Sequence, residues 1–239
     1  MPNFLPIDTI LVPQGAEYKA VCRGLSGITG SIPTVLPIPV GMKPLLKYLH
    51  ASQENGQFLA TKSRVLIMGI CGSLSDRYTV GDIVLYEDCV YQGKRQECDR
   101  PLTAELHSAL STQYSALSTQ DSPLNLVKAL TSDRVIWSFT EKRRLGETLA
   151  ADVVDMEGFT ALEFFNPAGV AVAMLRVVSD DCHHDIPDLT PAINSDGSLR
   201  PLPLAIGLLR QPLAATRLIR GSLKALKMLE QVSNLLFSK

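Results

Sequence analysis

The stretch GVAVAMLRVVSD, residues 169–180, combines small and β-branched apolar side chains with a single arginine, Arg176, and ends on Ser179 and Asp180. Continuous apolar runs of this length are typical of strands that are buried on both faces of a sheet. We therefore expect residues 169–180 to form a central strand, with Ser179 and Asp180 at its carboxyl end.

Two apolar runs upstream predict further strands. Residues 64–70, RVLIMGI, lead into a turn that contains Gly69 and Gly72. Residues 8–14, DTILVPQ, precede a predicted helix over residues 16–25. Strands that alternate with helices are typical of α/β folds with a mostly parallel sheet, so we expect that fold class.

The segments between these runs give weaker signals. Residues 80–93 predict two short strands after a Gly-Asp turn, and residues 134–138 predict another strand. Residues 99–130 are polar with helical patches, and residues 140–151 predict a polar connector that is helical in part. Residues 152–165 predict a strand end that leads into an apolar-faced helix.

The composition is that of a globular protein, with 239 residues, 46% hydrophobic and 20% charged. A net charge of −1 gives no general attraction for nucleic acid. Residues 200–239, however, hold seven basic residues and one acidic residue, and residues 202–238 predict helices interrupted at Pro212. Such a segment is typical of contact with an anionic partner, or of a solvated helix face. We expect one domain over residues 1–239, with a basic helical C-terminal extension from about residue 200.

The cysteines argue against a disulfide framework or a structural zinc site. Their number is odd and no CxxC pair occurs, which favours reduced thiols in a cytoplasmic protein and predicts no bound metal. The amino terminus lacks the basic region of a signal peptide, and no apolar run has the length of a transmembrane helix. The cysteines are Cys22, Cys71, Cys89, Cys98 and Cys182.

Three groups of polar or small residues are predicted to follow strand ends: Gly69–Gly72, Met156–Glu157 and Ser179–Asp180. In open α/β sheets, ligands bind at the carboxyl ends of the strands. A carboxyl group at the rim of the core holds its proton more readily, which suits Asp180 to general acid catalysis. The alternative for Asp180 is a helix cap or a solvated loop residue.

Glu157 and Met156 have two interpretations each. The Glu157 carboxylate can accept hydrogen bonds from two ribose hydroxyls, or it can be an acid favoured in the first turn of a helix. Met156 can pack on a sugar or base, or it can be a core methionine. The sequence leaves these alternatives open.

The glycine turn and the histidine pair are weak signals. The turn 69–73 matches neither common nucleotide-binding glycine pattern, although it suits a tight bend near a ligand. Cys71 within it is a candidate nucleophile or, more simply, a buried thiol. His183 and His184 could bind a metal, but a solvated loop or a substrate contact is the better interpretation.

Four stretches in order resemble the purine nucleoside phosphorylase and methylthioadenosine nucleosidase superfamily. They are VLIMGICGSL at 65–74, VGDIVL at 80–85, VVDMEG at 153–158 and MLRVVSDD at 174–181. The resemblance implies cleavage of the N-glycosidic bond of a nucleoside without a cofactor. It also implies a mixed, twisted sheet flanked by helices, in a homo-oligomer such as a dimer or a hexamer.

The resemblance also assigns roles to residues. It implies that Asp180 protonates N7 of a purine, that Met156 and Glu157 contact the ribose, and that Glu17 activates water. Glu157 would bind the 2′- and 3′-hydroxyls. The other implied contacts with the substrate are Gly69, Ile70, Cys71, Gly72, Val135, Trp137 and Ser179.

Departures from the family pattern favour hydrolysis over phosphorolysis. Ile70 stands where the phosphorylases place a phosphate-binding serine or threonine, and Ile67 where some of them place an arginine. A phosphorylase would therefore need a replacement anion site, for which Arg64 and Arg176 are the candidates. A phosphate-dependent phosphorylase and a non-catalytic nucleoside-binding protein are the alternatives to a nucleosidase.

The tail resembles that of a hopanoid-associated branch of the superfamily. It spans the stretch INSDGSLRPLPLAIGLLRQPLAATRLIRGSLKALKML, from residue 193 onward. That resemblance implies a lipid-linked adenosine, adenosylhopane, as the substrate. A basic amphipathic tail would then bring the protein to the membrane surface.

Overall fold

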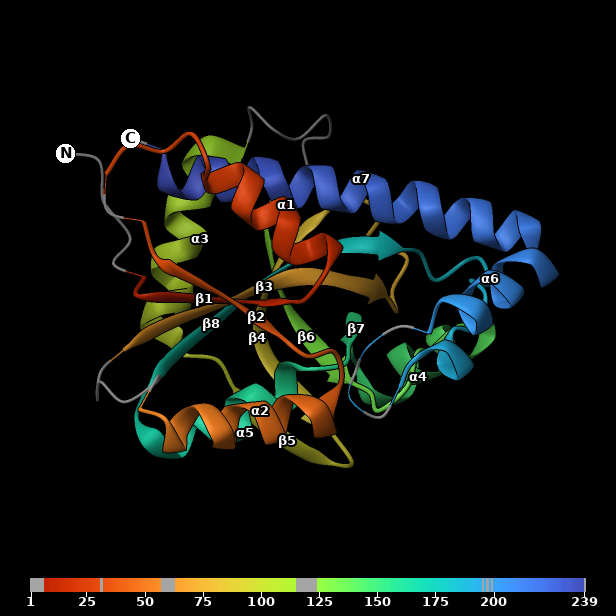
Figure 1. Ribbon diagram of the computed structural model, residues 1–239, viewed down its shortest axis with the longest axis horizontal. Coiled ribbons are helices and arrows are strands. Elements are labelled where there is room, and N and C mark those ends of the chain that lie inside the picture. Colours follow the sequence, from red (N-terminus) through yellow and green to blue (C-terminus); the bar gives the residue numbers. More distant parts are fainter. Residues whose placement is uncertain are drawn as a thin grey trace.

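The computed structural model describes residues 7–30, 32–56, 63–114, 124–194, 196, 198 and 200–238. Within these ranges, no helix is long and apolar enough to cross a membrane. The chain folds into a mixed sheet with helices on both faces (Figure 1), so the predicted α/β fold class is confirmed.

The strands form one twisted sheet in which most pairs are parallel. Strands β3, β8, β4, β6 and β7 pair in turn, and β7 pairs back to β3, so these five strands close into a ring. Strands β1 and β2 extend the sheet from β3, and β5 forms a hairpin with β4. The bounds are β1 Thr9–Pro13, β2 Thr34–Ile38, β3 Arg64–Ser73, β4 Ile83–Tyr91, β5 Lys94–Glu97, β6 Asn125–Thr131, β7 Val153–Asp155 and β8 Ala171–Asp180.

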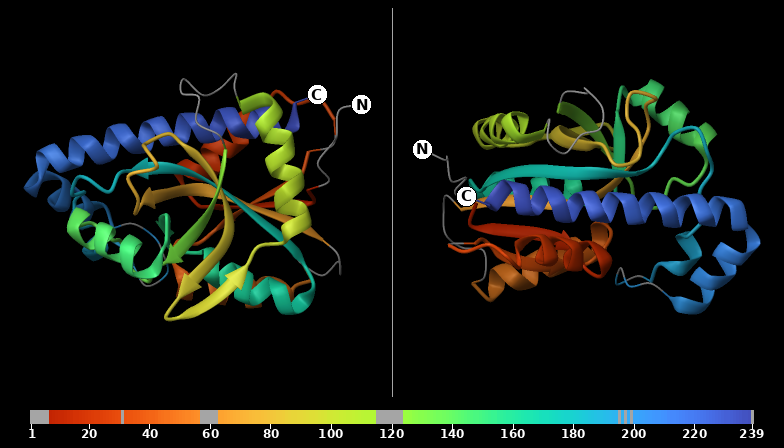
Figure 2. Two further views of the ribbon diagram at one scale, coloured as in Figure 1. Left: turned by 180° about the vertical axis from the view of Figure 1, so that it is seen from behind. Right: turned by 90° about the horizontal axis from the view of Figure 1, so that it is seen from above.

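The described residues contain seven α-helices, and five of them pack on the sheet. Helices α1, α3 and α7 pack on one face, and α2 and α5 pack on the other (Figures 1 and 2). The bounds are α1 Ala16–Leu25, α2 Met42–Glu54, α3 Arg100–Tyr114, α4 Phe139–Leu149, α5 Gly158–Phe165, α6 Pro201–Arg210 and α7 Pro212–Phe237.

Strand β8 is the centre of the sheet, as residues 169–180 predicted. Its side chains alternate between two apolar clusters: Leu175 and Val177 face α1 and α7, while Met174 and Val178 face α2 and α5. This double burial explains why the strand is almost continuously apolar. It also brings the end of β8 to the same edge of the sheet as the end of β3.

The prediction of a strand over residues 134–138 is wrong. The structure instead has strand β6 at Asn125–Thr131, in the stretch that we expected to be polar with helical patches. Burial is interrupted in the first half of β6, where Leu126 is 48% exposed and Lys128 is half-buried, and the polar residues of the strand break its apolar run. In the loop after it, Ser132 exchanges hydrogen bonds with the backbone of Arg134, which turns the chain out of the sheet.

The two short strands predicted over residues 80–93 are one strand, β4, followed by β5. Gln92 and Gly93 join them with positive φ angles of 47° and 77°, which are the dihedrals of a tight hairpin turn. The four residues of β5 are all polar, so no hydrophobic alternation marked the strand. Residues 140–151, predicted to be helical in part, lie in helix α4 and the turn after it.

Residues 201–237 form two helices that meet at Pro212. The carboxyl half of α7 belongs to the core, where Ala225, Leu229 and Val232 are fully buried against the sheet and α1. A Cβ on Gly24 of α1 would overlap the backbone of α7, so these two helices are in close contact. The amino half of α7 and all of α6 extend away from this body (Figure 1).

Candidate active site

Strands β3 and β8 run parallel in a register that aligns the predicted site residues. Gly69 pairs with Arg176, and Gly72 pairs with Asp180 after a bulge at Cys71. The glycine turn and the polar end of β8 therefore lie side by side at the carboxyl edge of the sheet. This is the edge at which α/β proteins bind ligands.

Arg176 is the buried cation at the centre of this edge, with 0% exposure. Its Nη2 atom lies 3.2 Å from Asp155 Oδ2 and 3.4 Å from Glu157 Oε2. Burial lowers the pKa of Arg176, but the two carboxylates together raise it by more than burial lowers it. The pKa of Arg176 therefore lies above its usual value. Asp155 is itself fixed by a hydrogen bond of 2.8 Å from the Thr131 hydroxyl.

Glu17 reaches the same cluster from the first turn of α1. Its Oε2 atom accepts a hydrogen bond of 2.8 Å from the backbone N–H of Ile70. Burial raises the pKa of Glu17 to about 8, with Arg176 opposing and the charge of Glu157 adding to the shift. A Cβ on Gly69 would overlap both Glu17 and Arg176, so only glycine permits this approach.

Glu157 is the first residue before helix α5. Its Oε1 atom accepts a hydrogen bond of 2.9 Å from the N–H of Gly41, in the loop before α2. Burial raises the pKa of Glu157, against the effect of Arg176. Met156 lies beside Gly41, since a Cβ on that glycine would be 3.9 Å from the Met156 methyl carbon. The ribose-binding pair predicted from the sequence is therefore adjacent to the Arg176 cluster.

Asp180, at the end of β8, is held by two neighbours. Its Oδ2 atom accepts a hydrogen bond of 2.7 Å from the Ser179 hydroxyl, which also lies 3.0 Å from the carbonyl of Cys71. Its Oδ1 atom forms an ion pair with the ammonium group of Lys142 on α4. A Cβ on Gly72 would be 2.9 Å from Oδ1, so the glycine leaves room for the carboxyl group.

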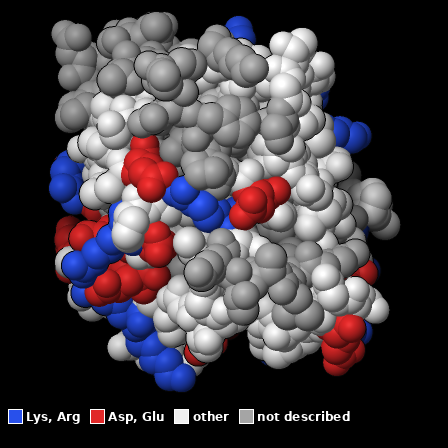
Figure 3. All heavy atoms as spheres, turned by 90° about the vertical axis from the view of Figure 1, so that its left-hand side faces the viewer, with Lys and Arg blue, Asp and Glu red and all other residues white. Residues whose placement is uncertain are grey.

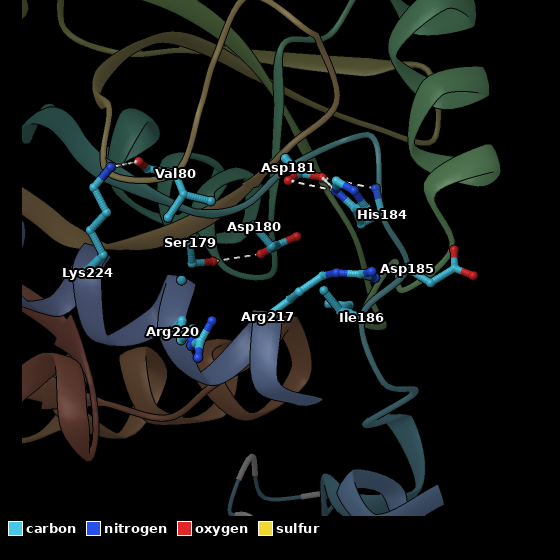
Figure 4. Close-up of a pocket in the computed structure, with 11 residues that line it drawn as sticks. Val80, Ser179, Asp180, Asp181, His184, Asp185, Ile186, Arg217, Arg220 and Lys224 are labelled. Carbon is cyan, nitrogen blue, oxygen red and sulfur yellow. Dashed lines mark hydrogen bonds and ion pairs between the residues drawn. The ribbon is translucent and has the colours of Figure 1, made fainter. Parts of the chain in front are cut away.

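A cavity of about 370 Å³ opens beside Asp180, between the end of β8 and helix α7. Figure 4 shows Arg217 and Arg220 pointing into this space from α7, opposite the loop that follows β8. That loop carries Asp181, whose carboxylate binds the ring of His184 at 3.0 Å. The acid predicted from the sequence thus lines a space large enough for a small ligand.

The glycine turn itself offers little reactivity. Burial raises the pKa of the Cys71 thiol well above its ordinary value, so the thiol stays neutral and is a poor nucleophile. The Ile70 side chain packs against the apolar cluster of α1 and α7. This segment positions its neighbours rather than presenting reactive groups.

Val135 and Trp137 lie in the loop between β6 and α4, and both are half-buried. The carbonyl of Trp137 accepts a hydrogen bond of 3.0 Å from the N–H of Ile186, so this loop contacts the loop after β8. The intervening Ile136 is buried in a separate small cluster with Leu74. Contact of Val135 or Trp137 with a base remains a prediction.

Both arginines that could replace a phosphate site already have acidic partners. Arg176 contacts two carboxylates through its Nη2 atom, whereas its Nε and Nη1 atoms have no hydrogen-bond partner among the described residues. Arg64 forms an ion pair with Glu105 at the start of β3. That end of the sheet is the opposite one, where acidic and basic side chains are interspersed on the surface (Figure 3). Neither arginine therefore offers phosphate a cation without a competing carboxylate.

Three contributors to the site were missed in the sequence. Asp155 directly precedes Met156 and could have been found as the partner of an arginine in the central strand. Gly41 contributes only its backbone N–H, and Lys142 lies in the polar segment TEKRR. Nothing in the sequence distinguishes these two residues from their neighbours.

Two groups lie at one edge of the α/β sheet: the carboxylate–arginine cluster around Arg176 and the acid Asp180. Together with the fold, they define the class of this protein. The chain belongs to the phosphorylase superfamily, whose sequence profile matches residues 48–194. The matched segment contains Glu157, Arg176 and Asp180, whereas Glu17 and helix α7 lie outside it. No curated protein matches the chain in a sequence comparison.

Solved structures share the fold. Futalosine hydrolase of Helicobacter pylori aligns with a TM-score of 0.63 at 17% identity, covering 95% of this chain and 97% of that one. A mutant of the Helicobacter pylori methylthioadenosine nucleosidase, with 5′-methylthioadenosine in its active site, gives 0.62 at 16%, covering 94% and 96%. The Campylobacter jejuni nucleosidase for 5′-methylthioadenosine and S-adenosyl homocysteine gives 0.59 at 15%, covering 94% and 99%.

Proposed function

We propose that this protein hydrolyses the N-glycosidic bond of a purine nucleoside. The observation that supports this most is the grouping of Glu17, Arg176 and Glu157 at the carboxyl edge of the sheet, where Asp180 ends β8. Cleavage of a glycosidic bond creates positive charge on the sugar and negative charge on the base. Carboxylates beside the sugar and an acid beside the base serve these two needs.

Each residue has one role in this reaction. Asp180 donates a proton to N7 of the purine, which makes the base a better leaving group. Glu157 accepts hydrogen bonds from the 2′- and 3′-hydroxyls, and Met156 contacts the ribose. Glu17 takes a proton from the attacking water, and a pKa near 8 makes its carboxylate a strong base. The family members of known structure that align here include enzymes for futalosine and 5′-methylthioadenosine.

Water is the proposed nucleophile because the buried cation of this cluster, Arg176, already has two carboxylates as partners, which repel a phosphate dianion. A phosphate dianion needs donors aimed at its oxygens, and leaving these unpaired costs several kcal/mol. Ile70 turns its side chain into the apolar cluster, and Arg176 already contacts two carboxylates. The phosphorylase alternative lacks a comparable supporting contact.

The product distinguishes the two reactions. Adenosine, 5′-methylthioadenosine and inosine are incubated with the protein, with and without phosphate, and the products are analysed by mass. We expect free ribose or a 5′-modified ribose at a rate indifferent to phosphate, and turnover lowered by about 10²-fold or more in an Asp180→Asn control. A ribose 1-phosphate that forms only with phosphate overturns hydrolysis. Binding without cleavage of any nucleoside points to the non-catalytic alternative.

We further propose that the substrate is a lipid-linked adenosine reached at a membrane surface. The support is the exposed apolar surface of α6 and the first turns of α7, called here the elbow: Leu202, Ile206, Leu209, Leu213, Ile219 and Leu223. Arg217 and Arg220 lie on the same helix as the elbow and line the cavity beside Asp180. A lipid-bound nucleoside could therefore enter the cavity from the side of the elbow. A cytoplasmic homo-oligomer, peripheral to the membrane, is part of this proposal.

A further inference from the structure

Helix α4 has an unusual buried residue. Its sequence, FTEKRRLGETL, is mostly polar, and its one fully buried side chain among the described residues is Lys142, with 0% exposure. The next two residues, Arg143 and Arg144, are basic as well but exposed. Of the three consecutive basic residues in this helix, only Lys142 is therefore buried.

The buried ammonium has two partners, both at the end of β8. Lys142 Nζ forms an ion pair with Asp180 Oδ1 and donates a hydrogen bond of 3.0 Å to the carbonyl of Asp181. Removing an ammonium group from water costs several kcal/mol, and an apolar side chain of similar volume often stabilises such a site better. A purely structural residue here would more simply be apolar.

Several charged side chains surround Asp180, but they differ in whether they contact its carboxylate. The cavity beside Asp180 also contains Asp181, His184 and Asp185 from the loop, and Arg217, Arg220 and Lys224 from α7. The structure shows no hydrogen bond or ion pair from Arg217 or Arg220 to Asp180, and Lys224 donates to the carbonyl of Val80. Among the described charged groups, Lys142 alone forms an ion pair with the acid.

We propose that Lys142 is a positioning residue for acid catalysis by Asp180, an inference that rests on the proposed function. The Asp180 carboxylate, which is paired with Lys142 in the structure, first takes a proton from solvent. The C1′–N9 bond then breaks with its electron pair moving onto the base, and the base takes that proton from the Asp180 carboxyl group. The carboxylate left behind then faces the Lys142 ammonium, which compensates its charge and holds it in place. Lys142 thus acts on the leaving group through Asp180 and does not contact the substrate.

Two substrates with different leaving groups test this role. A purine nucleoside needs protonation of its base, whereas 4-nitrophenyl β-D-ribofuranoside releases a stable anion and needs none. Lys142→Met, Lys142→Gln and Lys142→Arg are compared with Arg143→Met, the exposed neighbour on the same helix, and melting curves check that each variant folds. The kcat and KM of each variant are measured on both substrates.

We expect Lys142→Met and Lys142→Gln to lower kcat on the purine nucleoside by about 10²-fold, the scale of acid catalysis, with little change on the nitrophenyl substrate. Lys142→Arg should keep most of the activity, and Arg143→Met all of it. Equal losses on both substrates, or unchanged turnover, overturn the inference while leaving the proposed function intact. A wild-type protein that cleaves neither substrate overturns the proposed function, and this role with it.

Discussion

The carboxylate of Glu17 accepts a hydrogen bond from the backbone N–H of Ile70 at 2.8 Å, which links the first turn of α1 to the end of β3. This contact and the lack of a side chain at Gly69 bring Glu17 against Arg176. Burial in this position raises the pKa of Glu17 to about 8. The protonation state of Glu17 therefore changes in the pH range in which enzymes are commonly measured, and two predictions follow from that.

The activity should rise with pH up to about 8. Glu17 must lose its proton to act as a base, and its pKa of about 8 means that only a minor fraction is ionised at neutral pH. A profile of kcat/KM against pH should therefore show an acidic limb that ends near pH 8. Glu17→Gln should remove at least about 10²-fold of the activity. The exposed Glu147→Gln serves as the control; a profile that is flat from pH 6 to 9 contradicts the role.

The carboxyl group of Glu17 should also make the folded protein less stable as pH rises. In the unfolded chain Glu17 loses its proton near 4.5, but in the folded chain it keeps the proton up to about 8. Between these values the folded state binds more protons, so its stability falls with increasing pH. Glu17→Gln removes this loss. Relative to wild type, the variant should gain about 1 kcal/mol or more in unfolding free energy between pH 4.5 and pH 8.

Denaturant unfolding of the two proteins at pH 5, 6.5 and 8 measures this gain. The comparison uses the change in the difference between variant and wild type, because any weakening of the hydrogen bond from the Ile70 N–H affects all three points alike. A difference that stays constant over this range shows that the pKa of Glu17 is not raised in the folded protein.

The Lys142–Asp180 pair should show strong coupling in stability. Asp180→Asn leaves the buried ammonium of Lys142 without its counter-charge, and Lys142→Met leaves the carboxylate without its own. Breaking a buried pair from one side costs about 3–5 kcal/mol. The double variant removes both charges and should cost less than the sum of the two single variants.

Activity separates this coupling from catalysis. Asp180→Asn should lower turnover of a purine nucleoside by about 10²-fold or more, and the double variant should recover stability but not turnover. The exposed Asp76→Asn is the matched control. Additive unfolding free energies in the double-mutant cycle would show that the two groups do not interact.

Glu157 should discriminate ribosides from their dideoxy analogues. Its carboxylate is proposed to bind the 2′- and 3′-hydroxyls, so Glu157→Gln should weaken ribosides strongly and 2′,3′-dideoxy ligands little. The neutral amide can still accept the hydrogen bond from Gly41, which limits the damage to the loop. Calorimetric titration of both ligands measures the effect, with the exposed Glu163→Gln on the same helix as the control. Equal weakening of both ligands assigns Glu157 to structure alone.

The sequence predicted the centre of the fold because β8 and β3 are buried on both faces. Their apolar runs need no tertiary information, and the polar residues at their ends mark the site edge. Strand β6 was missed because the polar residues Asn125 and Lys128 interrupt its apolar pattern. Residues 134–138 look like a strand because Ile136 fills a small cluster, although the backbone around it is a loop.

The site was predictable to the same extent. Glu17, Glu157 and Asp180 were named from motifs, and the structure adds the partners that hold each of them. Lys142 comes from a helix that is mostly polar, and Gly41 contributes only a backbone N–H. Such contacts depend on how distant segments pack, so a single sequence does not contain them.

The last prediction concerns the elbow of α6 and α7. Leu209 and Leu213 are 80% and 75% exposed and lie four residues apart across the junction at Pro212. Arg210 lies between them, and Arg217 follows one turn later. Large apolar side chains that cluster on a surface mark an interaction site, and basic neighbours favour an anionic membrane. Each basic residue near such a surface contributes about 1 kcal/mol, which salt screens. We therefore expect the protein to sediment with anionic liposomes at low salt and less at high salt. Leu209→Gln with Leu213→Gln should reduce binding at both salt concentrations, whereas Leu126→Gln, a change at a leucine exposed on β6, should not. Replacing Arg210 and Arg217 by Gln should remove most of the salt dependence. If wild-type protein stays in solution with anionic liposomes at low salt, the elbow is a contact between protein chains and not a membrane surface.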